Sequence, residues 1–221
     1  MTMRLDRRGL VLGGLGVAAA GLGAAHGVRA QQVPTASQIE GPFYPYNPPR
    51  DQDADLVRLG AGDAEAMGQV THVFGTVWTG AATPLSDALV EIWQCDAHGR
   101  YRHPEDLEAG RAPDLRFQGY GRVLTGRDGS FRFRTIRPVS YAVTGTPIVR
   151  APHIHVAVST RGIRRLTSQL YVAGEPLNDS DIALSTVTSP AQREGLIRPY
   201  EDGAAYESGA LMVRYDLMVV I

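Results

Sequence analysis

The sequence predicts an all-β fold, a β-sandwich with an extended N-terminal arm and few short helices. Its 221 residues include 25 glycines and 14 prolines, which favour frequent turns over long helices. About seven short segments alternate apolar and polar residues between turn signals, a pattern typical of sandwiches. Hydrophobic residues make up 43% of the chain, so there is enough apolar material for a packed core.

The strands are predicted from this alternation. Residues 130–136 are the clearest case, because Phe131, Phe133 and Thr135 share one face. A turn signal at 127–129 separates this strand from another at 121–125, which predicts a hairpin. Further strands are expected at 70–78, 88–94, 153–159, 165–172 and 211–220.

One helix and one arm complete the expected domain. Ser189 is a capping residue, Pro190 takes the first helical position and Gln192 follows three residues after the cap. This pattern predicts a short helix that ends near Leu196. Residues 31–69 are polar and proline-rich, and are expected to wrap the sandwich as an extended arm.

The first thirty residues are expected to be a twin-arginine export signal. Arg7 and Arg8 precede seventeen uncharged residues at 9–25, and a small-residue cleavage site follows at 28–30. The domain at 31–221 is then expected in the periplasm or otherwise outside the cytoplasm, without stable membrane insertion. The alternative is an uncleaved membrane anchor, although seventeen residues are short for a span.

Composition excludes several classes of function. All 22 basic residues are arginine, so neither a lysine Schiff base nor a P-loop lysine is available. The single Cys95 excludes an intrachain disulfide and a thiolate zinc cluster. A net charge of −1 gives no support for a nucleic-acid partner.

A pair of histidines is the first candidate for chemistry. His153 and His155 lie in a predicted strand, where residues two apart point to the same face, so both imidazoles can reach one metal ion. Such a pair alone is a weak signal, because one of its histidines is often only part of a core or a surface. The glutamate that usually follows in a cupin-like site is absent from residues 156–160.

Longer motifs resemble the intradiol ring-cleavage dioxygenase family. The segment LVEIWQCDAHGRYRH at 89–103 is similar to the part of the family that carries its first tyrosine ligand, and RAPHIH at 150–155 is similar to its arginine and histidine pair. Residues 40–44, 119–122, 133–138 and 168–171 resemble further family segments. The likeness runs from about residue 35 to the C-terminus and is greatest for the protocatechuate 3,4-dioxygenase branch, in particular its beta subunit.

The resemblance implies a ferric centre. It assigns two tyrosines and two histidines as iron ligands: Tyr101, Tyr141, His153 and His155. Two phenolates and two imidazoles combine hard anionic oxygen with borderline nitrogen, a set that favours Fe(III) over softer ions. A free phenol has a pKa of about 10, and binding to a trivalent ion would deprotonate it.

The resemblance also implies a reaction. The expected substrate is a catechol-type ring, which O2 cleaves between the two hydroxyl-bearing carbons to give a cis,cis-muconate-type diacid. Tyr141 would accept a substrate proton, Arg150 would stabilise negative charge on the substrate, and Gln169 would lie around the same site. The interval from Tyr141 to His153 is twelve residues, one shorter than the common protocatechuate pattern.

A second class of function remains, a non-catalytic exported β-sandwich that binds or interacts. The patterns at 75–77, 84–88 and 128–131 also occur in transthyretin-like (prealbumin-like) extracellular modules. The presence of all four candidate ligands favours the enzyme. A carboxylated catechol, plain catechol, hydroxyquinol and a larger aryl compound all stay open as substrates. The resemblance implies a homo-oligomer and leaves the need for a partner subunit open.

Several other residues have simple interpretations. Trp93 and Cys95 are expected to be core residues, and Arg132 and Arg134 are expected on a solvated strand face. Tyr44 either borders the substrate pocket or anchors the arm.

Overall fold

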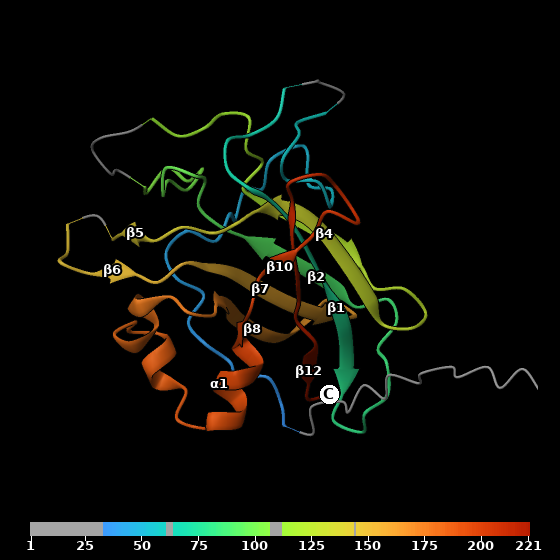
Figure 1. Cartoon of the computed structure of the whole chain (residues 1–221). Coiled ribbons are helices and arrows are strands. Elements are labelled where there is room, and N and C mark those ends of the chain that lie inside the picture. Colours follow the sequence, from blue (N-terminus) through green and yellow to red (C-terminus); the bar gives the residue numbers. More distant parts are fainter. Residues whose placement is uncertain (1–32, 61–63, 107–111, 144) are drawn as a thin grey trace, which may run out of the picture.

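The computed structural model describes residues 33–60, 64–106, 112–143 and 145–221, which form mostly strands (Figure 1). The first of its two five-stranded sheets contains β1 (Val70–Thr79), β4 (Ser130–Ile136), β10 (Glu201–Asp202), β11 (Leu211–Arg214) and β12 (Leu217–Val219). The second contains β2 (Leu89–Trp93), β3 (Tyr120–Leu124), β7 (His153–Thr160), β8 (Ile163–Val172) and β9 (Ile197–Arg198). β5 (Tyr141–Ala142) and β6 (Val149–Arg150) form a separate pair. The all-β prediction is confirmed.

The predicted strands match the observed ones closely, except at the C-terminal end. β1 pairs antiparallel with β4, and parallel with β11 and then β12. The single strand expected at 211–220 is therefore wrong, because Tyr215 and Asp216 interrupt it. The Asp216 side chain accepts a hydrogen bond from the Thr76 backbone N–H, and the Tyr215 carbonyl lies where a Cβ on Gly75 would stand. The missing side chain at Gly75 permits this close approach.

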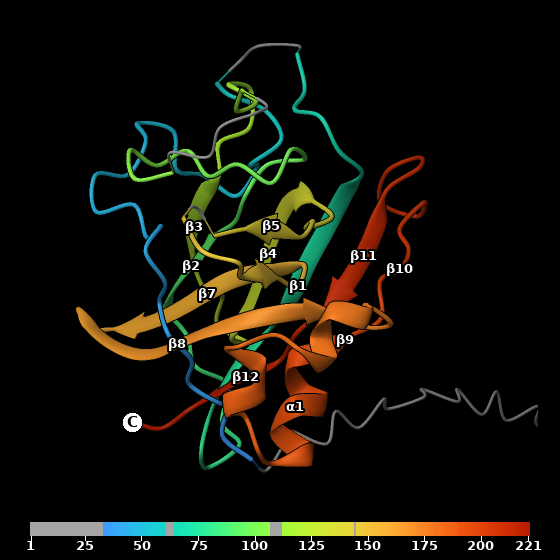
Figure 2. The ribbon, with the colours of Figure 1, turned by 90° about the vertical axis from the view of Figure 1, so that its left-hand side faces the viewer.

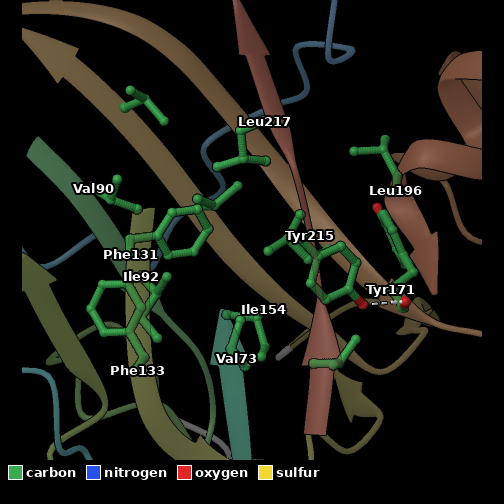
Figure 3. Close-up of a cluster of buried hydrophobic side chains, with 14 of the residues drawn as sticks. Val73, Val90, Ile92, Phe131, Phe133, Ile154, Tyr171, Leu196, Tyr215 and Leu217 are labelled. Carbon is green, nitrogen blue, oxygen red and sulfur yellow. Dashed lines mark hydrogen bonds between the residues drawn. The ribbon is translucent and has the colours of Figure 1, made fainter. Parts of the chain in front are cut away.

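The two large sheets pack against each other and share the main hydrophobic core. Val73 and Phe133 come from the first sheet, and Ile92 and Ile154 from the second; all four are completely buried (Figure 3). The Tyr215 hydroxyl donates a 2.6 Å hydrogen bond to the backbone carbonyl of Tyr171 in β8, which ties the two sheets together.

The helices are short, as expected. They are η1 (Pro176–Asp179), η2 (Leu184–Thr186) and α1 (Pro190–Leu196). α1 begins and ends where the sequence predicts, and the Ser189 side chain accepts a hydrogen bond from the Gln192 backbone N–H. The Gln192 side chain donates a hydrogen bond to the Pro34 carbonyl and not to the Ser189 backbone, so the start of the helix is also bonded to the arm. No helix among the described residues is long and apolar enough to cross a membrane, and the predicted export signal lies outside the described residues.

The described part of residues 33–69 is an arm without regular helices or strands. Near its start the Gln38 backbone N–H donates to the Thr167 carbonyl, and the Ser168 hydroxyl donates to the Ala36 carbonyl, so the arm follows β8 (Figure 2). The arm then continues past the site described below and reaches the first sheet near β4, where the Leu56 N–H donates to the Arg134 carbonyl.

Arg134 corrects one prediction, since it does not lie on a solvated face. Its side chain is only 15% exposed, and the guanidinium contacts Asp55 and Glu65 of the arm and Glu207 of the turn before β11. The sequence could not predict this, because all three carboxylates are distant along the chain. The hydrogen bonds that Arg134 donates to Glu207 outweigh the effect of burial and raise the pKa of Arg134.

This ion cluster leads to a stability prediction. Arg134→Met should lower the free energy of unfolding by about 2 kcal/mol, because three carboxylates lose their shared cation. Arg58→Met is the control, since Arg58 is half exposed and, among the described residues, forms an ion pair only with Glu65; it should cost about 0.5 kcal/mol or less. Denaturant titration measures both, and equal losses would contradict a stabilising role for the cluster.

Candidate metal centre

The site begins on β7, the middle strand of the second sheet. His153 and His155 point to one face of this strand, as predicted, while Ile154 and Val156 point to the other and belong to the main core. The histidines therefore lie on the face that is turned away from the first sheet. Both are almost completely buried, with exposed fractions of 1%.

The two imidazoles approach each other edge to face, through their Nε2 atoms. Their Nε2 atoms are 3.1 Å apart. The other ring nitrogen of His153, Nδ1, lies 2.6 Å from the Ala151 carbonyl. A carbonyl can only accept, so Nδ1 carries the proton and Nε2 of the neutral ring has a free lone pair. Burial and the nearby Arg150 lower the pKa of His153 to about 3. Burial and His153 hold the pKa of His155 well below its usual value.

The two predicted tyrosine ligands join this pair from separate segments. Tyr101 lies in the loop after β2, and Tyr141 begins β5. Their rings meet edge to face with centroids 5.1 Å apart. The Tyr141 ring is 5.6 Å from His153, and the Tyr101 ring is 6.2 Å from His155. The structure thus brings all four predicted residues together.

The Tyr101 hydroxyl is poorly satisfied without a further group. The Tyr101 hydroxyl is buried and has no hydrogen-bond partner among the described residues. Burial, with Tyr141 close by, raises the pKa of Tyr101 well above its usual value, and burial also raises the pKa of Tyr141. A buried hydroxyl without a partner is costly, so this atom marks a place where a ligand or ion would be favourable.

The spacing of the two imidazole nitrogens is compatible with a shared metal ion. Imidazole nitrogens bind metals at about 2.1 Å, so two at right angles on one ion are about 3.0 Å apart, close to the spacing here. Among the described residues no three His, Cys, Asp or Glu side chains form a metal-binding group. The donor set depends on the two tyrosines, which supply oxygen where a carboxylate would otherwise be needed.

Arg150 lies beside this centre and is not a surface residue. It pairs with Tyr141 across β5 and β6 and is 2% exposed. Its Nε and Nη2 atoms donate to Asp181 at 2.9 and 3.1 Å, and Nη2 also donates to Gln169 Oε1 at 2.5 Å. Burial raises the pKa of Asp181, but hydrogen bonds from Arg150 and from backbone N–H groups outweigh it and bring the pKa to about 2.

Two residues of β8 lie beside the histidines of β7. Gln169 lies directly opposite His155, and Tyr171 opposite His153. The Gln169 amide donates to the Ile39 carbonyl of the arm, and its oxygen accepts from Tyr171 at 3.0 Å as well as from Arg150. Gln169 therefore holds Arg150 and the arm beside the histidines.

The sequence did not single out two residues that complete the surroundings. Asp181 follows η1 without any motif of its own, and only the fold reveals it as the partner of Arg150. Phe43 lies in a motif noted above, and its ring stacks on Tyr101 at 4.5 Å and meets Tyr141 at 6.1 Å. The expected core position of Cys95 is confirmed, and burial raises the pKa of its thiol to about 12.

A cavity of about 360 Å³ lies against one side of the site. Phe43, Trp93 and Tyr101 contribute to its walls, whereas Tyr141 and the histidines do not line it. Arg50 and Arg102 also line the cavity, and neither forms an ion pair with another described residue.

Tyr44 is not part of the lining of this cavity. Its hydroxyl donates to Glu91 at 2.8 Å, which supports the alternative that it anchors the arm.

Comparisons with known proteins identify the family of the chain. Residues 39–220 match the family model described as Dioxygenase. The chain is 34% identical to the protocatechuate 3,4-dioxygenase beta chain of Burkholderia cepacia, covering 76% of this chain and 71% of that protein. It is 31% identical to a catechol 1,2-dioxygenase of Acinetobacter baylyi, covering 74% of this chain but only 52% of that protein, about half its length.

A solved structure is also similar. The dioxygenase domain of a dioxygenase carbohydrate-binding protein fusion from Streptomyces sp. SirexAA-E has 28% sequence identity and a TM-score of 0.60. The match covers 86% of this chain and 99% of that domain.

The buried pair of Arg150 and Asp181 yields a prediction that needs no ligand. Asp181→Asn and Arg150→Met should each lower the free energy of unfolding by about 3 kcal/mol, because each leaves its partner buried and unpaired. The double variant should lose clearly less than the two single losses combined. Denaturant titration of the four proteins measures this coupling, and strict additivity would show that the pair does not act as a unit.

Proposed function

We propose, since the chain belongs to the intradiol ring-cleavage dioxygenase family, that it holds one ferric ion and uses O2 to cleave a catechol-type ring between its hydroxyl-bearing carbons. The product would be a cis,cis-muconate-type diacid. One observation carries the proposal: Tyr101, Tyr141, His153 and His155 cluster at one buried place, with neighbouring rings and with the two imidazole Nε2 atoms 3.1 Å apart. A non-catalytic binding module would not need this arrangement.

The four converging side chains would hold the iron. When bound, a ferric ion supplies a Lewis acid and redox partner that draws electron density from a catecholate and makes the ring reactive toward O2. Its positive charge would also allow both tyrosines to ionise, although burial disfavours their charged forms. Both histidines are held neutral by burial, and His153, with its proton on Nδ1, already presents the Nε2 lone pair that binding requires.

The other residues would handle the substrate's charge and protons. Tyr141 Oη is the proposed acceptor of a proton from a substrate hydroxyl. Arg150 opposes the effect of burial and favours the anionic form of Tyr141, and the same positive charge would favour an anionic substrate. Asp181 and Gln169 fix the guanidinium, so little reorganisation is needed when charge develops.

We propose a carboxylated, protocatechuate-like catechol as the preferred substrate. The cavity beside Tyr101 supports this, because Arg50 and Arg102 offer cations within an aromatic wall. Plain catechol, hydroxyquinol and a larger aryl compound are the alternatives, and a panel of these compounds in an oxygen-uptake assay would separate them.

The remaining proposals concern the whole protein. Residues 1–30 would direct it through the twin-arginine route to the periplasm, supported by Arg7 and Arg8, and residues 31–221 would form the catalytic domain. Two packed sheets with a shared core support a transthyretin-like sandwich. Association into a homo-oligomer is proposed from the family alone.

Loss of one phenol tests the metal site. Tyr101→Phe should remove most of the iron and the visible colour that tyrosinate-to-iron charge transfer gives, because one anionic ligand is lost. Tyr200→Phe is the control, since it also removes a buried tyrosine hydroxyl but outside the site. Metal analysis and absorption spectra of iron-replete preparations measure this. Wild-type protein without iron or colour would contradict the proposed function.

Removal of the cavity arginines tests the substrate. Arg50→Gln and Arg102→Gln should each raise KM for a carboxylated catechol about tenfold, the equivalent of roughly 1.4 kcal/mol, and change KM for plain catechol little. Arg127→Gln, in the turn before β4, should leave both values unchanged. Equal effects on the two substrates would show that these arginines do not recognise the carboxylate.

A further inference from the structure

The two histidines of the site are held in different ways. His153 donates from Nδ1 to the Ala151 carbonyl, a bond that fixes the plane of its ring. Nδ1 of His155 is buried and has no hydrogen-bond partner among the described residues. Histidines that bind metals are normally oriented by a hydrogen bond from their second nitrogen. His155 Nε2 lies 3.1 Å from His153 Nε2, but Nε2 is the atom that would bind the ion, so no hydrogen bond among the described residues is left to orient the His155 ring in the metal-bound form.

Trp93 lies where it can do this. It is the direct neighbour of His155 across β2 and β7. The indole and imidazole planes are nearly parallel, at 9°, and their centroids are 4.7 Å apart. The backbone of the arm also approaches the same imidazole: a Cβ placed on Gly41 would lie 3.4 Å from His155 Cε1. Stacking thus leaves the ring little freedom to turn.

Trp93 is itself fixed from its other side. The Tyr44 ring meets it edge to face at 5.0 Å and 83°. Glu91 accepts hydrogen bonds from the hydroxyls of Tyr44 and Tyr120 at 2.8 and 2.7 Å, and lies 3.2 Å from Arg164 Nη2. This cluster ties the indole to the arm, to β3 and to β8.

A purely space-filling role explains Trp93 poorly. Its Nε1–H is buried without a partner among the described residues, which costs about 1–3 kcal/mol. An aliphatic or phenyl side chain would fill a core position without that cost. What tryptophan adds here is a wide, flat surface against His155.

We infer that Trp93 is a positioning residue, whose indole sets the plane of the His155 imidazole and so directs its Nε2 toward the point shared with His153, Tyr101 and Tyr141. The inference rests on the proposed function, because that point is where the iron would bind. The expected core position of Trp93 is confirmed, and the inference adds a role in the site to it.

The test uses the iron-loaded protein and two substitutions. Trp93→Leu removes the flat surface and should weaken iron binding about tenfold and shift the tyrosinate-to-iron absorption band. Trp93→Phe keeps a smaller aromatic surface and should show the same changes at reduced size. Trp78→Leu is the matched control, since Trp78 lies on β1 of the other sheet and also has a buried, unpaired Nε1. It should leave the iron dissociation rate and the band unchanged.

The outcomes are distinguishable. Wild-type iron dissociation and spectra in both Trp93 variants, or equal changes in both, would overturn the positioning role. If Trp93→Leu does not fold, Trp93→Phe decides alone, and an unchanged band with unchanged iron dissociation overturns it. Wild-type protein that binds no iron would instead contradict the proposed function.

Discussion

The register of β7 against β2 and β8 is the constraint on which the site depends. It places Trp93, His155 and Gln169 in one row across three strands, and Tyr171 opposite His153. The same alternation sends Ile154 into the core between the large sheets. A slip of one residue would exchange these faces, putting the imidazoles into the core and the apolar side chains into the site. The apolar core therefore enforces the geometry of the polar site.

Burial then determines the charge state that this geometry can hold. The four converging donors are almost inaccessible to water, and burial favours the neutral form of each. Arg150 and Asp181 neutralise each other beside them. The space between these four side chains is therefore poorly suited to free phenolates but well suited to phenolates that face a multivalent cation. Metal binding and tyrosine ionisation are expected to be coupled, with protons released as the ion enters.

The sequence predicted the parts of the fold that local patterns encode. The alternation at 130–136 and the cap at Ser189 depend on neighbouring residues, and both appear as expected. The interruption at Tyr215 and the carboxylates around Arg134 depend on contacts between distant segments, so no local pattern could indicate them. Asp181 was missed for the same reason. The four predicted donors were recognised only through motifs, since spacing alone supported no more than the histidine pair.

The arm shows why the site could not be built from single motifs. Gln38 accepts a hydrogen bond from the Gln169 backbone N–H and donates to the Tyr171 hydroxyl and the Ala183 carbonyl. A few residues later, Gly41 approaches His155 and Phe43 stacks on Tyr101. A segment without regular structure thus closes the outer side of a site that the sheet only half encloses. The docked arm buries the two tyrosines and the two histidines, and this burial favours the neutral form of each side chain.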